Sequence, residues 1–203
     1  MKKIMFIGDI HGQFEIYFKI IEQIDCDYSI QLGDMGIGFP DTQIEYNSIF
    51  PIENKHKFIR GNHDNPLVCQ NHQHYLGDFG INKDGIFLVG GGNSIDKEWR
   101  TPFVDWWPDE ELSYQQFNQI IDLYSKEKPE YVITHAPPLE LLPLTSTFNF
   151  IDENNTSKCF SELLKIHKPK KWIFAHMHTN FNQIVESVNF ICVDQYSYYI
   201  LEI

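Results

Sequence analysis

Five short polar clusters constrain the fold of this chain more than any other feature of its sequence. Four of them follow directly on short apolar runs that are typical of buried strands, and one follows a more mixed run. The clusters are Gly8-Asp9-Ile10-His11-Gly12, Gly33-Asp34, Gly61-Asn62-His63-Asp64, Thr134-His135 and Ala175-His176-Met177-His178. In an α/β fold, ligands collect at the carboxyl ends of the strands. We therefore expect the five clusters to converge on one rim of the molecule.

The clusters combine carboxylates, imidazoles and one carboxamide, without a thiolate. This set of donors is typical of a hydrolytic site with two metal ions. Asp9 and His11 are two residues apart, so both side chains of an extended segment point to one face, and the same holds for His176 and His178. Taken singly, the clusters have simpler alternatives, such as an N-capping Asp9 or an Asx turn at Asn62.

The residue types within the clusters indicate separate roles. Asp34 carries a carboxylate that can bridge two ions, and Asn62 offers a neutral oxygen ligand. His63 would stand at the rim of the site, where Asp64 could accept a hydrogen bond from its ring and fix its tautomer. His135 precedes a stiff segment with two prolines, which would hold the imidazole rigidly.

Strand and helix patterns alternate along much of the chain. Apolar residues recur at helical spacing in segments that begin near Phe14, Ser113 and Phe160, and Ser113 and Gln116 have the spacing of a capping box. Three closely spaced strands are predicted in the last quarter as an antiparallel meander, at residues 181–186, 188–193 and 198–203. We expect an α/β fold of two packed mixed β-sheets flanked by helices, in a single domain over residues 1–203.

Cysteine usage and hydropathy indicate a cytoplasmic protein. The four cysteines are far apart and form no C-x-x-C pair, which favours free buried thiols in a reducing compartment. No apolar run approaches the roughly 20 residues that a membrane helix needs. The apolar stretch behind Met1-Lys2-Lys3 is too short for a signal peptide. We therefore expect no membrane association.

The five clusters resemble the signature of the calcineurin-like metallophosphoesterases. That signature reads Asp-x-His, Gly-Asp, Gly-Asn-His-Asp/Glu, a later His and Gly-His-x-His, and the blocks occur here in the same order over residues 9–178. Ala175 stands where the last block of the family has Gly. Asp34 is followed by Met35, so the Asp-Arg-Gly continuation of protein Ser/Thr phosphatases, with its phosphate-gripping Arg, is missing. Residues 90–107 are similar to those of small bacterial and phage members.

The resemblance implies two divalent ions whose ligand sets share one residue. The implied sets are Asp9, His11, Asp34 and His178 for one ion, and Asp34, Asn62, His135 and His176 for the other. It also implies that His63 is the catalytic acid. A ligand set of oxygen and nitrogen atoms suits Mn²⁺ best, with Fe, Ni or Zn as alternatives.

The resulting hypothesis is a binuclear phosphoesterase that hydrolyses phosphomonoesters, phosphodiesters or both. Two alternatives stay open. A catalytically inactive scaffold with the same fold would be expected to have lost ligands, and a structural metalloprotein would need neither His63 nor an open coordination position. The formal charge of −12 argues against a long nucleic acid, because phosphate neutralisation by Lys and Arg supplies most of such affinity. A small or locally held phosphate ester suits this surface better.

The chain has only two arginines, Arg60 and Arg100, as candidates for phosphate contact. Arg60 lies at the end of an apolar strand and is interpreted as structural. Arg100 lies in the long segment 90–112, which we expect to fold beside the metal rim, because long loops in compact domains are often functional. Arg100 would then bind a phosphate oxygen bidentately. Trp106 and Trp107 would either offer a stacking face or, as we favour slightly, anchor the loop to the core.

Overall fold

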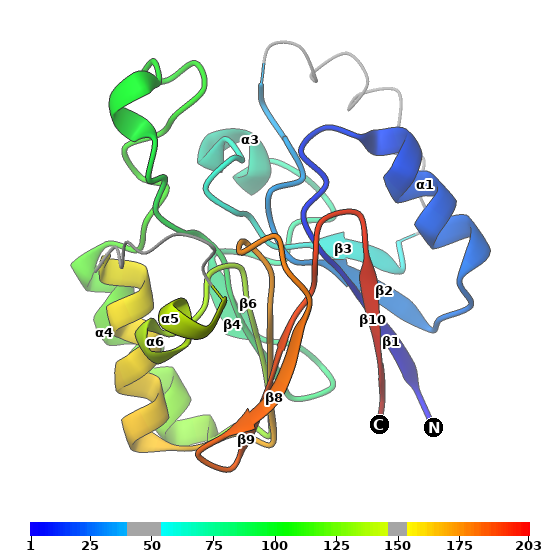
Figure 1. The fold of residues 1–203 in the computed structure, drawn as a ribbon, viewed down its shortest axis with the longest axis vertical. Coiled ribbons are helices and arrows are strands. Elements are labelled where there is room, and N and C mark those ends of the chain that lie inside the picture. Colours follow the sequence, from blue (N-terminus) through cyan, green and yellow to red (C-terminus); the bar gives the residue numbers. More distant parts are fainter. Residues whose placement is uncertain (40–53, 146–153) are drawn as a thin grey trace.

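Two packed β-sheets form the centre of the molecule in a computed structural model that describes residues 1–39, 54–145 and 154–203. The smaller sheet has four strands in the order β10-β1-β2-β3. These strands are β1 (Lys3–Ile7), β2 (Tyr28–Gln31), β3 (His56–Phe58) and β10 (Tyr198–Glu202). β1, β2 and β3 run parallel, whereas β10 pairs antiparallel with β1 (Figure 1).

The larger sheet has six strands in the order β4-β5-β6-β7-β9-β8. They are β4 (Phe79–Ile81), β5 (Ile86–Val89), β6 (Tyr131–Thr134), β7 (Lys171–Phe174), β8 (Phe181–Val185) and β9 (Val188–Cys192). The four central strands run parallel, and β4 and β8 pair antiparallel at the two edges. Both sheets are therefore mixed, as the sequence predicts.

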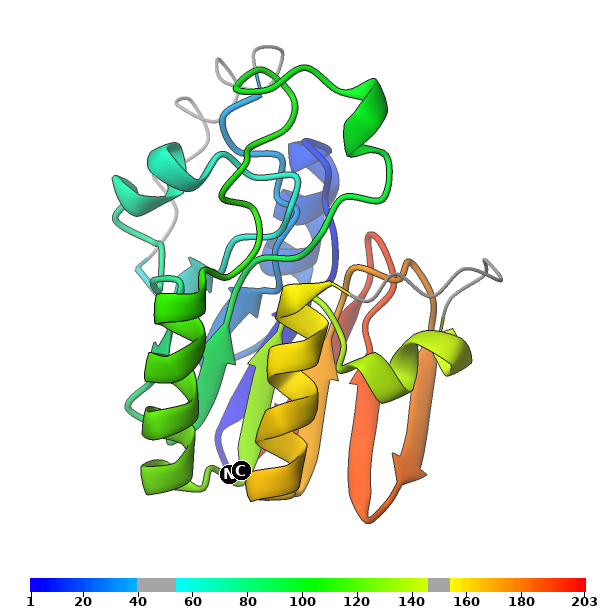
Figure 2. The same cartoon turned by 90° about the vertical axis from the view of Figure 1, so that its left-hand side faces the viewer.

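Helices cover the outer faces of the two sheets (Figure 1, Figure 2). α1 (Phe14–Gln23) lies against the smaller sheet, and α4 (Tyr114–Glu127) and α6 (Asn155–Ile166) lie against the larger one. The shorter elements are α3 (Pro66–Gln70), α5 (Leu142–Thr145) and the 3-10 helices η1 (Lys97–Trp99) and η2 (Leu139–Leu141). The α/β sandwich expected from the sequence is confirmed.

The alternation of side chains along β1 shows how the sequence builds these layers. Ile4 and Phe6 belong to the core between the two sheets, whereas Met5 and Ile7 pack with Phe14 of α1 on the other face. All four strand residues are fully buried, and a strand with two buried faces has a continuous apolar sequence. A third core lies between the larger sheet and the helices α4 and α6.

The second predicted helix begins with the expected capping box. Ser113 is the N-cap of α4, its side chain accepts a hydrogen bond from the N–H of Gln116, and the Gln116 side chain binds back to the backbone of Ser113. Lys128 ends the helix in the left-handed conformation, with φ at +44°. The polar cap and the apolar face of this segment therefore both contributed to a correct prediction.

The last three strands do not form the predicted meander. β8 and β9 form an antiparallel hairpin, but β10 leaves it and pairs with β1 in the other sheet. The connection crosses the rim, where the N–H of Tyr196 donates to the carbonyl oxygen of Asp9 (3.0 Å) and the N–H of Gly8 donates to that of Ser197 (3.0 Å). Leu201 of β10 then joins the core between the sheets, which is the burial that favours this crossing.

All four cysteines lie in the described residues, where each is buried and forms no disulfide, as predicted. Across residues 1–39, 54–145 and 154–203, no helix combines the length and the apolar character that membrane crossing requires.

Candidate metal centre

The five polar clusters meet where β1, β2, β3, β6 and β7 end. Backbone hydrogen bonds join the loops that carry them. The N–H of His11 donates to the carbonyl oxygen of Asp34 (2.8 Å), and the N–H of Ala175 donates to that of His135 (3.0 Å). The predicted convergence of the clusters on one rim is therefore present in the fold.

Asp9, His11 and His178 form a first group whose ligand atoms all lie within 4.8 Å of one another. His178 Nε2 lies 2.8 Å from Asp9 Oδ2. His11 Nε2 lies 3.1 Å from His178 Nε2 and 3.6 Å from the same carboxylate oxygen. Asp9 is buried and His178 is exposed, so one ion bound here would be reached from solvent on the His178 side.

Asp34, His135 and His176 form a second group that meets the same distance criterion. His135 Nε2 lies 3.4 Å from Asp34 Oδ1, and the rings of His135 and His176 are 4.9 Å apart. Asn62 adds a neutral oxygen, because its Oδ1 lies 3.0 Å from His135 Nε2. These four residues are the set that the family resemblance implies for one ion.

The Asp34 carboxylate lies between the two groups. Its Oδ1 is the oxygen 3.4 Å from His135 Nε2, and its Oδ2 lies 3.7 Å from His11 Nε2. Each oxygen therefore faces a different group, an arrangement that suits a carboxylate shared by two ions. Asp34 is almost completely buried, with 1% of its surface exposed.

Four of the predicted ligands have backbone conformations that most residue types avoid. The φ angles are +46° at His11, +56° at Asp34, +66° at His176 and +46° at His178. Asp and His tolerate the left-handed region better than bulky residues do, but it still carries strain. Strained backbone conformations persist only where the surrounding fold holds the residues in place, and they are common at functional sites.

Two glycines allow the loops around Asp34 to approach one another closely. A Cβ atom at Gly61 would collide with Asp34, and one at Gly33 would lie 2.6 Å from Nδ1 of His135. Gly33 also has φ at +98°, which side chains rarely permit. The Gly residues that precede Asp34 and Asn62 are therefore required by the close approach of these loops.

The donor atoms of the second group fit a cation. His135 Nδ1 donates to the carbonyl oxygen of Leu32 (2.8 Å), since a carbonyl oxygen can only accept. In the neutral ring, Nε2 then carries a lone pair, and it faces Asn62 Oδ1 at 3.0 Å. A histidine that donates its other N–H to a carbonyl group is the usual arrangement of a metal ligand.

One oxygen of the Asp9 carboxylate in the first group also lacks a suitable partner, whereas Oδ1 accepts a hydrogen bond from the N–H of His176 (3.2 Å). Asp9 Oδ2 is buried and receives no hydrogen bond of proper geometry from the described residues, although His178 Nε2 is only 2.8 Å away. Burial alone would raise the pKa of Asp9, but His11 and His178 lower it to about 2. A buried, ionised carboxylate among imidazole nitrogens is suited to bind a divalent cation.

The pKa values of the second group show competition for protons. Burial lowers the pKa of His135, but the neighbouring Asp34 raises it to about 9. Burial, and then the charge of His135, lower the pKa of His176 to about 3. Only one of the two rings therefore holds a second proton near neutral pH, and a bound cation would displace it.

His63 lies beside the first ligand group without belonging to it. Its ring centroid is 5.2 Å from that of His11, and its backbone N–H donates to Asp34 Oδ1 (2.7 Å). Phe39 lies on another side of the ring, at 6.4 Å between centroids. Burial lowers the pKa of His63, and the charge of Asp34 opposes this shift. The ring therefore has the position at the rim that the sequence predicts.

The predicted hydrogen bond between Asp64 and the His63 ring is wrong. The Asp64 carboxylate is fully buried and instead accepts hydrogen bonds from four backbone N–H groups. The donors are Met35 (3.3 Å), Gly36 (2.8 Å), Ile37 (2.9 Å) and Gly61 (2.8 Å). Neighbouring side chains in a chain segment point in different directions, so Asp64 faces the interior when His63 faces the rim. Its observed contacts hold together the turns that carry Asp34 and Asn62.

The segment 90–112 lies beside the rim, as expected, and its arginine is held by an acidic partner. Nε and Nη2 of Arg100 each donate to the Asp96 carboxylate at 2.7 Å, and Nη1 donates to the carbonyl oxygen of Asp105 (3.2 Å). Burial is the main cause that lowers the pKa of His63, and the charge of Arg100 lowers it further. Arg100 is therefore close enough to act electrostatically on the site.

Trp107 and the second arginine, Arg60, anchor this segment. Trp107 is buried, and its ring lies 5.1 Å from that of Phe39, which favours the anchoring interpretation for Trp107. Arg60 is also buried and donates from Nε to Asp78 (2.7 Å), consistent with a structural role. Trp99, in contrast, is 85% exposed.

Two residues that the sequence patterns did not single out contact the predicted ligands. Gln195 Nε2 lies 2.9 Å from Nδ1 of His178, and Ser94 Oγ accepts a hydrogen bond from Nδ2 of Asn62 (3.0 Å). Gln195 follows β9, which runs parallel to β7, and Ser94 follows β5, which runs parallel to β6. Both strands therefore end at the same rim as β6 and β7. A search for polar residues after every parallel strand would have found them.

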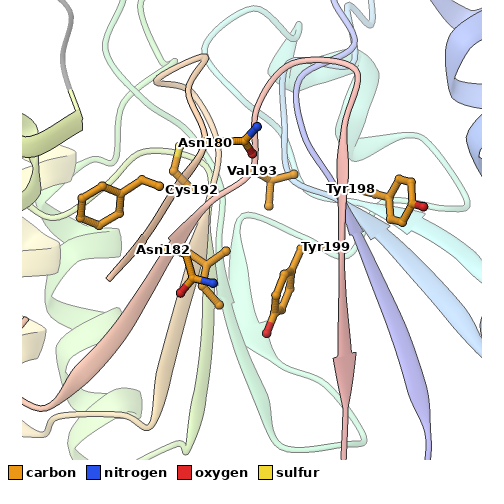
Figure 3. Close-up of a pocket in the computed structure, with 8 residues that line it drawn as sticks. Asn180, Asn182, Cys192, Val193, Tyr198 and Tyr199 are labelled. Atoms are coloured by element: carbon orange, nitrogen blue, oxygen red, sulfur yellow. The ribbon is translucent and has the colours of Figure 1, made fainter. Parts of the chain in front are cut away.

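A pocket near the rim is distinct from the ligand groups (Figure 3). It lies between the β8–β9 hairpin and β10, and Figure 3 shows Asn182 and Tyr199 on opposite sides of it. Asn180 also lines it, only two residues after His178. Its lining includes none of the predicted metal ligands.

Comparison with known families decides the classification. The model of the family described as calcineurin-like phosphoesterase matches residues 2–180, which include every predicted ligand. The chain belongs to the calcineurin-like phosphoesterase family. No curated protein matches this phosphoesterase.

Solved structures share the fold of this phosphoesterase at low sequence identity. A protein of Thermus thermophilus has a TM-score of 0.62 and 14% identity, over 98% of this chain and 93% of that chain. A dimetal phosphatase of Danio rerio has a TM-score of 0.57 and 12% identity, over 97% and 88%. A candidate 5′-nucleotidase of Staphylococcus aureus, in complex with α-ketoglutarate, has a TM-score of 0.55 and 15% identity, over 98% of this chain and 50% of that chain. This chain thus spans half of the Staphylococcus protein, and the likeness concerns the fold.

The geometry predicts that Asp34 is harder to replace than any ligand that faces one group only. Asp34→Asn should weaken the binding of both ions, because it removes the negative charge between the two groups and replaces one of the two ligand oxygens with an amide nitrogen. His178→Ala should lose only the ion of the first group. Elemental analysis after equilibration with Mn²⁺ and desalting would measure the metal content. Asp122→Asn, an exposed position on α4, is the matched control and should keep full content. Full metal content in Asp34→Asn would show that this carboxylate is not shared.

Proposed function

We propose that this phosphoesterase hydrolyses phosphomonoesters, phosphodiesters or both at a centre of two divalent metal ions. The observation that carries the proposal is the position of Asp34, whose two oxygens face two separate ligand groups. The similarity in fold to a dimetal phosphatase of Danio rerio supports it. A single structural ion would not need the second group.

The proposed roles follow from the positions of the side chains. Asp9, His11 and His178 would hold one ion, Asn62, His135 and His176 would hold the other, and Asp34 would contact both. When bound, such ions supply positive charge to phosphate oxygens and lower the pKa of water. His63 would donate the proton of a ring N–H to the leaving alkoxide. The hydrogen bond from its backbone N–H to Asp34 keeps the His63 ring at a fixed place beside the ligands.

The remaining expectations concern metal, substrate size and location. The oxygen and nitrogen donors suit Mn²⁺ best, with Fe, Ni or Zn as alternatives. The formal charge of −12 favours a small or locally held phosphate ester over a long nucleic acid. Four free, buried cysteines favour the reducing cytoplasm.

Hydrolysis by the wild type and by His63→Ala tests the proposal. Wild-type protein with Mn²⁺ should hydrolyse p-nitrophenyl phosphate, bis-p-nitrophenyl phosphate or both, and chelation should abolish the activity. His63→Ala should keep its metal and lose roughly 10²–10⁴-fold in turnover on alkyl esters, the usual contribution of a general acid. Activated aryl esters should lose less, because their leaving groups need little protonation.

The matched control for this experiment is His167→Ala. His167 follows α6 and contacts the carbonyl oxygen of Pro129, away from the ligand groups. This variant should keep wild-type activity on all substrates. Full activity after chelation would contradict the metal-dependent mechanism, and equal losses on alkyl and aryl esters would remove His63 from the role of acid.

We also propose that Arg100 binds a phosphate oxygen of the substrate. Its guanidinium group has five N–H donors, of which three are used by Asp96 and Asp105. The other two have no partner among the described residues, and Asp96 fixes the plane of the group. A planar donor pair that is held in place is suited to a phosphate.

Arg100→Ala should lower kcat/KM about 10–100-fold, because a hydrogen bond to a charged group contributes about 1.5–3 kcal/mol. The loss should fall mainly on KM, and the metal content should stay unchanged. Arg100→Lys should recover only part, since Lys cannot make the bidentate contact. Lys83→Ala, in the loop between β4 and β5, is the control. Unchanged kinetics of Arg100→Ala on every substrate would exclude the contact.

A further inference from the structure

We propose that Ser94 and Glu110 are positioning residues that decide which end of the Asn62 carboxamide faces the metal centre. This inference rests on the proposed function, because it concerns a ligand of the second group. The carboxamide of Asn62 has an oxygen that can bind a cation and an NH₂ group that cannot. A contact that selects the orientation before the ion binds would therefore raise the affinity for that ion.

The Asn62 side chain has one polar partner on each side. Its residue surface is 2% exposed, so water does not decide its orientation. On the side of the metal centre, Oδ1 lies 3.0 Å from His135 Nε2. On the other side, Nδ2 lies 3.0 Å from Ser94 Oγ. The orientation of the carboxamide therefore depends on whether Ser94 Oγ accepts a hydrogen bond from Asn62 or donates one to it.

The hydroxyl group of Ser94 has a single proton and can donate only one hydrogen bond. Ser94 Oγ lies 2.6 Å from Glu110 Oε2, and the backbone N–H of Ser94 donates to Glu110 Oε1 (2.8 Å). A carboxylate accepts hydrogen bonds and has none to give, so the hydroxyl proton points at Glu110. Toward Asn62, Ser94 Oγ can then only accept. Asn62 must present its NH₂ group to Ser94 and its oxygen to the metal centre.

Glu110 is itself fixed by the core of the molecule. It is 2% exposed, and its carbonyl oxygen accepts hydrogen bonds from Nη1 of Arg60 (2.7 Å) and from the N–H of Gly92 (3.3 Å). Arg60 is in turn paired with Asp78. A chain of contacts thus runs from a buried ion pair through Glu110 and Ser94 to the ligand oxygen.

The consequence of losing Ser94 concerns the metal-free protein. Without the hydroxyl group, the NH₂ group of Asn62 would be buried without an acceptor. Nothing would then hold the NH₂ group on the Ser94 side, so the turned orientation, with the NH₂ group toward the metal centre, would become more populated. The ion would then have to reverse this turn, so its affinity would fall. The first group does not include Asn62 and would be unaffected.

Titration of the metal-free protein with Mn²⁺ in a calorimeter tests the inference. Ser94→Ala should lower the affinity for one of the two ions about 10–100-fold, the usual effect of a residue that orients a ligand, and leave the other unchanged. Glu110→Gln should lower the affinity for the same ion. Its NH₂ group would donate to Ser94 Oγ, release the hydroxyl proton toward Asn62 and so favour the turned carboxamide.

A double-mutant cycle separates orientation from general loosening of the loop. In Asn62→Asp, the side chain carries oxygen on both sides and needs no orientation. In the Asn62→Asp background, Ser94→Ala should therefore cost little affinity for either ion. A merely structural role of Ser94 predicts the same loss in both backgrounds. Such an equal loss would overturn the inference.

Ser113→Ala is the matched control for the loss of a serine hydroxyl group. It removes the N-cap of α4 and should lower the melting temperature of the metal-free protein without changing either metal affinity. The wild-type titration separates two failures. If wild-type protein binds fewer than two ions, the proposed metal centre is wrong. If it binds two and Ser94→Ala binds both with wild-type affinity, the metal centre stands and this inference is wrong.

Discussion

The position of the Asp34 carboxylate between two groups of histidines is the contact on which the rest of the site depends. Its backbone is equally important, because its carbonyl oxygen accepts the N–H groups of Ile10 (3.0 Å) and His11 (2.8 Å). Asp34 thus fixes the loop of the first group and offers one oxygen to each group. Burial alone would raise the pKa of this carboxyl group, but His135 and His63 keep it well below its usual range. A permanently charged group is thereby held at the centre of the rim.

Two further buried carboxylates form a frame around this centre. The Asp64 carboxylate accepts hydrogen bonds from four backbone N–H groups in the turns after β2 and β3, and it thereby joins these two turns. The Glu110 carboxylate accepts hydrogen bonds from the backbone N–H and the hydroxyl group of Ser94, and it thereby ties together two parts of the segment after β5. A buried carboxylate is stable only where its oxygens find donors, so each of these residues specifies the local backbone closely. The frame explains how loops from two different sheets keep strained ligand conformations such as those of His11 and His176.

Much of the fold and the location of the site could be predicted, because both depend on local patterns. Apolar runs followed by polar clusters located the parallel strands and the rim, and Ser113 with Gln116 located the start of α4. The path of β10 could not be predicted from local patterns. Its alternation suits either sheet, and only contacts across the chain, such as Leu201 in the core between the sheets, decide between them. Asp64 was misassigned because adjacency in sequence says little about which side chains meet.

The central claim is that two ions lie on either side of Asp34. Anomalous diffraction from a crystal grown with Mn²⁺, measured above and below the metal absorption edge, tests it most directly. The account predicts two peaks about 3.5–4 Å apart, the usual separation in two-metal sites. One peak should lie among Asp9, His11 and His178, the other among Asn62, His135 and His176, with one Asp34 oxygen toward each. A single peak at full occupancy, or two peaks without Asp34 between them, would contradict the account.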